Sequence, residues 1–270
     1  MNKKFLIIIL AVIVIVGVFV TLGIKKAVNV INLANNRPSA HNLLNQARQM
    51  EAKGDLLEAK SIYQKLVNDF TESPEVALWQ KKAEDINIKL LFSAAITPKS
   101  IIYQIKSGDT LNKIAREHKT TTELIMKSNN ISDSLITPGR KIKIWNAPFS
   151  ILVDKSQNIM LLKSDEEVMK TYIVSTGKDN CTPVGVFKIV NKLVDPTWFR
   201  AGAVVPAGSS ENVLGTRWMG FDLAGYGIHG TTEPKDLGKQ VTQGCVRLSN
   251  SDVEELYNII PTGTEVTVVE

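Results

Sequence analysis

The spacing of apolar and polar positions divides this chain into four stretches of different character. The first, residues 5–24, reads FLIIILAVIVIVGVFVTLGI and contains no charged side chain. As a helix, such a run is long enough to cross about 30 Å of hydrocarbon. It exceeds the apolar core of a cleaved signal peptide, and no small-residue cleavage motif follows it. We therefore expect a transmembrane helix that anchors the chain over residues 1–26, followed by a polar linker over residues 27–40.

Residues 41–97 show an apolar period of three and four positions, which is typical of amphipathic helices. The central run begins after Asp55, and Glu58 stands three positions later, as in a helix-capping box. Similar periods on either side of this run predict an α-helical hairpin of two or three members. The apolar face of the central helix comprises Leu56, Ala59, Ile62, Tyr63, Leu66, Val67 and Phe70.

This helical region resembles a tetratricopeptide repeat at a small set of positions. They are Ala47, Gly54, Asp55, Ala59, Tyr63 and Pro74. The resemblance covers little more than one repeat, whereas such arrays usually need about three to bury a continuous core. Two interpretations stay open: a helical spacer or oligomerisation element, and a module that docks a protein partner.

The third stretch, residues 102–146, contains two strands with two helices between them. An alternating strand over residues 103–106 turns into a helix that Asp109 is expected to cap. After a second helical run, the sequence Thr-Pro-Gly at residues 137–139 forms a turn before a closing strand at residues 142–145. The pattern predicts a small βααβ domain.

The βααβ unit resembles a LysM domain. The likeness rests on Gly-Asp-Thr-Leu at residues 108–111, on Asn129, and on the Pro-Gly pair before the last strand. It implies binding to glycans that contain N-acetylglucosamine, such as peptidoglycan or chitin. The alternative for Asp109 and Asn129 is that they only cap a helix and close a turn. The candidate glycan-binding residues that the resemblance implies are Gly108, Asp109, Thr110, Asn129 and Ile131.

The fourth stretch, residues 149–270, consists of short apolar runs separated by glycine, proline, asparagine and aspartate. This pattern predicts a mainly β, sandwich-like domain. One helix interrupts it over residues 251–259, where Ser251 and Glu254 have the spacing of a capping box. A turn at residues 261–263 then leads into the last strand.

Charge and composition exclude several classes of partner. The net charge is +5, but the basic residues are scattered and no basic run alternates with aromatic residues, so we predict no nucleic-acid partner. The chain has only two cysteines and three histidines. No third or fourth ligand stands at usable spacing from them, so we expect neither a metal nor another cofactor.

The stretch around His229 and Cys245 carries the candidate chemistry. A thiol that transfers an acyl group needs a base, and amide donors where negative charge develops on the substrate oxygen. His229 can supply the base, and Gly244 lets the backbone before Cys245 turn tightly and present its N–H groups. The alternatives are a cysteine that serves as a small buried hydrophobe and a histidine hydrogen-bonded at a strand end.

Residues 149–269 resemble an L,D-transpeptidase catalytic domain of the YkuD type. The resemblance implies that Cys245 is the nucleophile, that His229 acts first as base and then as acid, and that the carbonyl of Gly230 orients the imidazole. The segments that carry it are TPVGVF (182–187), DPTWF (195–199), NVLGTRWM (212–219), YGIHGT (226–231) and GCVR (244–247).

Four residues near the thiol are candidates for oxyanion or substrate binding. Many members of the family have histidine where this chain has Gln243, and an amide cannot exchange a proton near neutral pH. Because His229 occupies the general-base position, we expect activity to be retained. Arg247 either grips a substrate carboxylate or braces the loop, and Cys181 is expected to be unpaired. The four candidates are Gly244, Gln243, Arg247 and Thr231.

These resemblances imply a peptidoglycan L,D-transpeptidase. The cysteine would attack the third residue of a tetrapeptide stem, release D-alanine and pass the acyl group to an amine, which cross-links stems or attaches another amine. Water as acceptor would make an L,D-carboxypeptidase, and a non-catalytic peptidoglycan-binding scaffold is the alternative from another class. The family also implies acylation by carbapenems. Such a substrate lies outside the cytoplasmic membrane, so we expect a single-pass membrane protein with its catalytic domain in the periplasm or cell wall.

Overall fold

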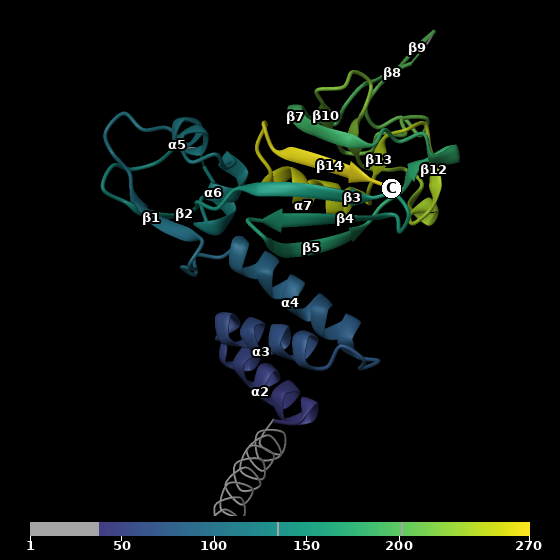
Figure 1. Ribbon diagram of the computed structural model, residues 1–270. Helices are drawn as coiled ribbons and strands as arrows, with labels where there is room; N and C mark the ends of the chain where they lie inside the picture. Colours follow the sequence, from purple (N-terminus) through teal and green to yellow (C-terminus); the bar gives the residue numbers. More distant parts are fainter. Residues whose placement is uncertain (1–37, 134, 201) are drawn as a thin grey trace, which may run out of the picture.

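The computed structural model describes residues 38–133, 135–200 and 202–270 and arranges them as three packed units (Figure 1). A helical region forms the base, a small βααβ domain lies at one side, and a larger β domain lies above the helices. The expected membrane anchor lies outside the described residues. Within those residues, no helix is both long and apolar enough to cross a bilayer.

Three consecutive helices form the base, and the middle one packs against both others. Gly54 ends the first helix with a φ of 79°, in the left-handed region that favours glycine. Asp55 caps the second helix by accepting a hydrogen bond from the N–H of Glu58 (3.2 Å), as predicted. Tyr63 and Trp79 are almost fully buried in the core that the helices share. The helices are α2 (Ala40–Lys53), α3 (Leu56–Asp69) and α4 (Val76–Leu91).

The small domain pairs its first and last strands antiparallel around two short helices. The expected helix cap at Asp109 is wrong, because Thr110 precedes the helix and accepts a hydrogen bond from the N–H of Lys113 (3.2 Å). Asp109 instead closes the turn after the first strand, where it accepts hydrogen bonds from the N–H of Lys106 and the hydroxyl of Tyr103, both at 2.8 Å. The elements are β1 (Ser100–Gln104), α5 (Leu111–Glu117), α6 (Thr122–Ser128) and β2 (Lys141–Trp145).

The larger domain confirms the mainly β prediction and is built on one eight-stranded mixed sheet. The sheet curls until its two edges meet. Ser175 follows the edge strand β5 and exchanges two backbone hydrogen bonds (2.8 and 2.9 Å) with Arg247 on the opposite edge strand. In spatial order the strands are β13 (Val246–Arg247), β11 (Gly227–His229), β10 (Arg217–Phe221), β7 (Gly185–Val194), β14 (Glu265–Val269), β3 (Phe149–Asp154), β4 (Ile159–Ser164) and β5 (Glu167–Ile173).

Shorter elements complete this domain. Two small sheets flank the main one: β6 (Thr176–Gly177) pairs with β12 (Gln240–Thr242), and β8 (Trp198–Arg200) pairs with β9 (Ala203–Val205). The β8–β9 hairpin projects from the body of the domain (Figure 1). Single turns of 3-10 helix, η1 (Lys178–Asn180) and η2 (Pro234–Asp236), lie in the connecting loops.

The last helix, α7 (Asn250–Ile259), begins at a different cap from the predicted one. Ser249 precedes the helix, accepts a hydrogen bond from the N–H of Asp252 (3.1 Å) and donates its hydroxyl to that carboxylate (2.7 Å). The expected box at Ser251 and Glu254 is therefore wrong by two positions. Both pairs have capping-box spacing, and the earlier cap leaves the apolar side of the helix, Val253, Leu256 and Ile259, buried in the core of the β domain.

Helix α4 covers the exposed edge of the large sheet. Asn87 donates through Nδ2 to the carbonyls of Val168 and Met169 (3.3 and 3.2 Å) on edge strand β5. Glu84 accepts from the backbone N–H of Thr171 (3.1 Å) and from its hydroxyl (2.8 Å). An uncovered edge strand offers unpaired backbone groups to other chains, and these side chains occupy them here.

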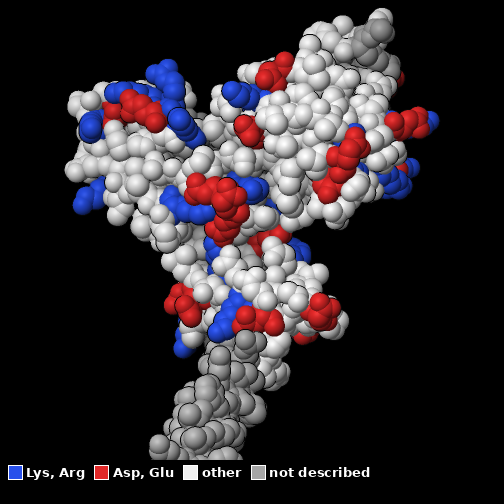
Figure 2. All heavy atoms as spheres, viewed as in Figure 1, with Lys and Arg blue, Asp and Glu red and all other residues white. Residues whose placement is uncertain are grey.

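Charged contacts add to this interface. Lys60 of α3 and Lys99 before β1 both pair with Glu167 at the start of β5, the second at 3.1 Å. Figure 2 shows acidic and basic side chains intermixed where the helices meet the upper domains. Lys143 of β2 is buried and donates through Nζ to the carbonyls of Leu90 (2.6 Å) and Ser93 (2.8 Å) at the end of α4, and burial lowers its pKa to about 8. The helical region thus contacts both other units of its own chain.

Replacing Glu84 with alanine tests the importance of this edge contact. Glu84→Ala leaves the N–H and hydroxyl of Thr171 without their acceptor, so the free energy of unfolding should fall by about 1–3 kcal/mol in urea denaturation. Glu72→Ala, which truncates an exposed glutamate of the same region, should change it by less than about 0.5 kcal/mol. Equal effects of the two changes would show that the α4–β5 contact adds no stability.

Candidate active site

The register of two short parallel strands places the predicted thiol and imidazole on the same face of the domain. Strand β11 pairs with β13 so that Ile228 lies opposite Val246 and His229 lies opposite Arg247. Ile228 and Val246 are fully buried in the core of the domain. Because side chains alternate between the faces of a strand, His229 and Arg247 face the other side, and so does Cys245, one residue before β13.

On that side lies a cavity of about 460 Å³. Cys245, His229, Arg247 and Gln243 are among its polar groups, together with Thr197 and Thr242. Its walls are otherwise mainly apolar and come from strands β7, β8, β10 and β12 and from the loops before β8 and β10. These residues include Trp198, Phe199, Val213, Leu214, Trp218 and Val241. An apolar cavity with a few converging polar groups is the usual form of a small-molecule or active site.

His229 is held in one tautomer. Its Nδ1 lies 2.7 Å from the carbonyl oxygen of Gly230, which can only accept a hydrogen bond, so Nδ1 carries the proton and Nε2 is left to accept one. Trp218, opposite His229 on β10, stacks on the imidazole with ring centroids 6.1 Å apart. Burial lowers the pKa of His229 to about 4. The hydrogen bond to Gly230 raises this pKa, and the nearby charge of Arg247 lowers it further. The imidazole is therefore neutral at pH 7.

Cys245 is a protonated thiol in this state. Burial raises its pKa to about 11, although the backbone of Gly227 and the charge of Arg247 act in the opposite direction. Its Sγ lies 3.5 Å from the carbonyl oxygen of Gly225. Since the imidazole is neutral and the thiol is protonated, the pair rests as thiol and imidazole, and a proton must move when the thiol reacts.

The backbone before Cys245 requires glycine. Gly244 has a φ of 121°, and a Cβ there would lie 2.7 Å from the ring of Tyr226. Thr242 fixes this turn, because its hydroxyl accepts from the N–H of Gly244 (3.1 Å) and donates to the carbonyl of Cys245 (2.7 Å). The N–H of Gly244 is thereby engaged, whereas that of Cys245 has no acceptor among the described residues. The expected tight turn is present, and Cys245 itself offers the amide donor.

The other three predicted residues near the thiol differ from one another in burial and in their contacts. Gln243 is exposed at the cavity wall. Arg247 is buried, with one nitrogen 3.6 Å from Glu233 and its Nε without a partner in the described part of the chain. Thr231 does not line the cavity. Its N–H donates to Asn250 (3.0 Å), and its hydroxyl accepts from the N–H of Glu233 (2.8 Å). Thr231 thus holds the loop after His229 in place.

Sequence reasoning missed two residues that shape this site. Asn250 accepts hydrogen bonds through Oδ1 from the N–H groups of Thr231 (3.0 Å) and Thr216 (3.3 Å), and it packs so closely on Gly230 that a Cβ there would lie 2.2 Å away. Trp218 covers one face of the imidazole. Trp218 lies within one of the segments that carry the family resemblance, but nothing in the sequence pairs it with His229.

The candidate glycan-binding residues of the small domain are largely engaged within it. Hydrogen bonds from Lys106 and Tyr103 lower the pKa of Asp109. Asn129 bridges α6 and β2, because it accepts from the N–H of Lys143 (2.7 Å) and donates to its carbonyl (2.8 Å). The other three are the cap Thr110, the turn residue Gly108 with a φ of 81°, and the buried Ile131.

Cys181 lies close to the reactive loop. It is an exposed free cysteine, and its Sγ is 4.0 Å from the carbonyl oxygen of Thr242. Cys245 is also free, so no disulfide joins the two thiols in this structure.

Comparison with known proteins identifies two domains of this chain. Residues 148–268 match the model of the YkuD L,D-transpeptidase catalytic domain, and residues 103–145 match that of the LysM domain. The protein YkuD of Bacillus subtilis (strain 168), which carries a provisional L,D-transpeptidase name, is 34% identical over 175 residues that cover 62% of this chain and 98% of that protein. This chain therefore belongs to the YkuD family of L,D-transpeptidases, and it carries a LysM domain beside the catalytic one.

Two further similar proteins match a smaller part of this chain. YqjB of Bacillus subtilis (strain 168), which also has a provisional L,D-transpeptidase name, is 38% identical over 126 residues, covering 44% of this chain and 70% of that protein. A solved catalytic domain of the E. faecium L,D-transpeptidase, acylated by ertapenem, is 27% identical. It covers 46% of this chain and 98% of its own, with a TM-score of 0.38.

The pKa values of the pair predict how the thiol reacts with a simple electrophile. In Cys181→Ala protein, alkylation of Cys245 by iodoacetamide should accelerate about tenfold per pH unit between about pH 7 and pH 10, because the thiolate fraction grows below a pKa of about 11. Intact mass measured over time gives the rate, and Cys245→Ala protein gives the reference for the exposed Cys181. A rate already constant from about pH 5 would indicate a preformed thiolate–imidazolium pair and contradict both pKa shifts.

Proposed function

We propose that this protein is a peptidoglycan L,D-transpeptidase in which Cys245 carries the acyl group and His229 transfers the protons. The observation that carries the proposal is the β11–β13 register, which puts both side chains on one face of a largely apolar cavity. Membership of the L,D-transpeptidase family supports the reaction class.

The first half-reaction begins with proton transfer. Nε2 of His229 takes the thiol proton as the sulfur of Cys245 bonds to the carbonyl carbon of the third residue of a tetrapeptide stem. The free N–H of Cys245 is suited to stabilise the oxygen that becomes negative. The C–N bond to D-alanine then breaks, and the departing amine receives the proton from His229, which leaves a thioester on Cys245.

The second half-reaction reverses these roles. An acceptor amine attacks the thioester carbon while His229 takes its proton, the C–S bond breaks, and the sulfur of Cys245 recovers that proton. An amine from a second stem gives a cross-link between the third residues of two stems. Water as acceptor would give L,D-carboxypeptidase activity, and the mainly apolar cavity walls favour the amine because they disfavour bulk water.

Arg247 is assigned to a substrate carboxylate. Its guanidinium is buried at the cavity, and its Nε has no partner among the described residues, while Glu233 lies 3.6 Å from another nitrogen. A buried guanidinium donor without an acceptor is costly, and a stem carboxylate would satisfy it. Gln243, on the cavity wall, can hydrogen-bond substrate but takes no part in proton transfer, because His229 fills that role.

The domain organisation supports a site of action outside the cytoplasm. The LysM domain is packed beside the catalytic domain, so wall binding and acyl transfer occur on one body, with the helical region as its base. We extend the proposal to residues 1–26, which lie outside the described part of the chain, as the membrane anchor.

Reaction with a carbapenem tests the proposed nucleophile. The full-length protein incubated with meropenem should gain one intact drug mass, because the thiolate opens the β-lactam ring without losing atoms. Cys181→Ala should gain the same mass, and Cys245→Ala should gain none. An unmodified wild type would favour the rival view of a wall-binding scaffold, for which Gln243 is the argument. An adduct that persists in Cys245→Ala would assign the reaction to another group.

A further inference from the structure

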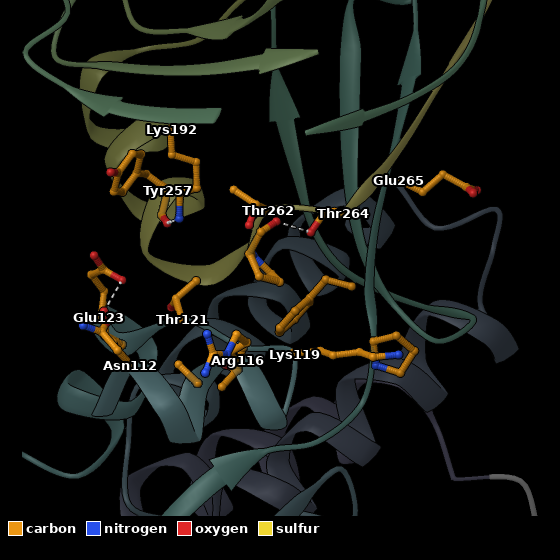
Figure 3. Close-up of a pocket in the computed structure, with 17 residues that line it drawn as sticks. Asn112, Arg116, Lys119, Thr121, Glu123, Lys192, Tyr257, Thr262, Thr264 and Glu265 are labelled. Carbon is orange, nitrogen blue, oxygen red and sulfur yellow. Dashed lines mark hydrogen bonds between the residues drawn. The ribbon is translucent and has the colours of Figure 1, made fainter. Parts of the chain in front are cut away.

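A groove of about 780 Å³ runs between the LysM domain and the catalytic domain (Figure 3). It lies apart from the cavity that contains Cys245, and the two share no lining residue. Helix α5 and the start of α6 form one wall, and the end of α7, the α7–β14 loop and Lys192 of β7 form the other. The lining residues that matter here are Asn112, Arg116, Lys119, Thr120, Lys192 and Tyr257.

Both walls are held in fixed positions. Thr121 at the cap of α6 donates its hydroxyl to the carbonyl of Asn258 on α7. Leu124 of α6 is buried within the hydrophobic core of the catalytic domain. Across the groove, Lys192 donates to the carbonyls of Tyr257 (2.6 Å) and Ile260 (2.9 Å) and so closes the end of α7. A ligand therefore meets a preformed site that spans two domains.

The LysM wall presents two cations without acidic partners. Arg116 and Lys119 are exposed, lie three positions apart at the end of α5, and form no ion pair with any described residue. Figure 3 shows the guanidinium of Arg116 directed into the groove. Two acidic residues, Glu123 and Glu265, also line it. Glu123 accepts a hydrogen bond from the Thr122 hydroxyl (3.0 Å), and its charge acts on Lys192 of the opposite wall, while Glu265 points away from the centre (Figure 3).

Lys119 occupies a backbone position that normally selects another residue. Its φ is 50°, and the N–H of Thr120 bonds to the carbonyl of Ala115 (2.9 Å), which is the helix ending where glycine is preferred. All other described residues with positive φ are glycine, asparagine or aspartate, the types that tolerate this conformation. The lysine therefore costs backbone strain, which points to a use for its side chain.

Polar groups that suit a hydroxylated chain accompany these cations. Thr120 is buried at the groove, and its hydroxyl has no hydrogen-bond partner among the described residues. Asn112, four positions before Arg116 on the same face of α5, adds an exposed amide. Cations that can bind carboxylates thus stand beside hydroxyl and amide groups that can bind a saccharide.

We propose that this interdomain groove binds the carboxylate-bearing glycopeptide chain of peptidoglycan, with Arg116 and Lys119 on its free carboxylates. This inference rests on the proposed function for the identity of the polymer. Because the groove belongs to both domains, it holds the chain in a fixed position relative to the cavity at Cys245.

The test measures sedimentation of the full-length protein with peptidoglycan that acid treatment has freed of phosphodiester polymers. Lys119→Gly should relieve the backbone strain and raise the Tm, yet weaken binding roughly three- to fivefold, and Arg116→Gln should weaken it similarly. Lys141→Gln, which removes an exposed lysine of the same domain outside the groove, should bind like wild type. Amidation of the polymer carboxylates, which removes the acceptors of both cations, should weaken wild-type binding more than either variant does.

Several results would overturn the proposal. The carboxylate contact would be ruled out if Lys119→Gly and Arg116→Gln bind peptidoglycan as tightly as wild type. It would also be ruled out if amidation of the polymer leaves wild-type binding unchanged. Binding only to peptidoglycan that retains its phosphodiester polymers would assign the groove to phosphate instead. Carbapenem acylation, which needs no glycan, is measured on the same samples, so loss of the groove and loss of the Cys245 chemistry are told apart.

Discussion

The candidate active site depends on the parallel pairing of β11 with β13. This pairing buries Ile228 and Val246 in the core and turns His229, Cys245 and Arg247 to the opposite face. Slipping the register by one residue would exchange the two sets of side chains, so packing of the apolar pair specifies the position of the reactive pair. The bond between Ser175 and Arg247, which closes the curled sheet, fixes the same strand from its other side.

Burial also determines the protonation states of the two side chains. Burial keeps His229 neutral and Cys245 protonated, so the resting pair carries no charge in a mainly apolar cavity. A neutral imidazole with Nδ1 held by Gly230 is ready to accept a proton on Nε2. The helical base attaches to this body through Glu84 and Asn87 on β5, and the LysM domain attaches to it through Leu124, which is buried in the catalytic core. Lys143 joins the LysM domain to the end of α4.

Local patterns predicted the elements and pointed to Cys245 and His229, which line one cavity, but not what tertiary packing decides. The βααβ unit, the mainly β domain and the choice of Cys245 and His229 as candidates follow from periodicity and from motifs within short segments. The caps at Asp109 and Ser251 were wrong because neighbouring residues offered equivalent side chains, and only packing chose Thr110 and Ser249. The roles of Asn250 and Trp218 were not predicted, because their partners lie on other strands and loops and no spacing in the sequence indicates those contacts.

The central claim is that the acyl group of the substrate passes through Cys245. Its most direct test is to mix the protein with a tetrapeptide stem whose own acceptor amine is blocked, with no other amine present, and to weigh the intact protein within the first turnover. The account predicts a mass gain equal to the stem minus D-alanine, located on Cys245 and lost when an amine is added as the cross-linked product appears. Release of D-alanine at an unchanged rate by Cys245→Ala protein would contradict it.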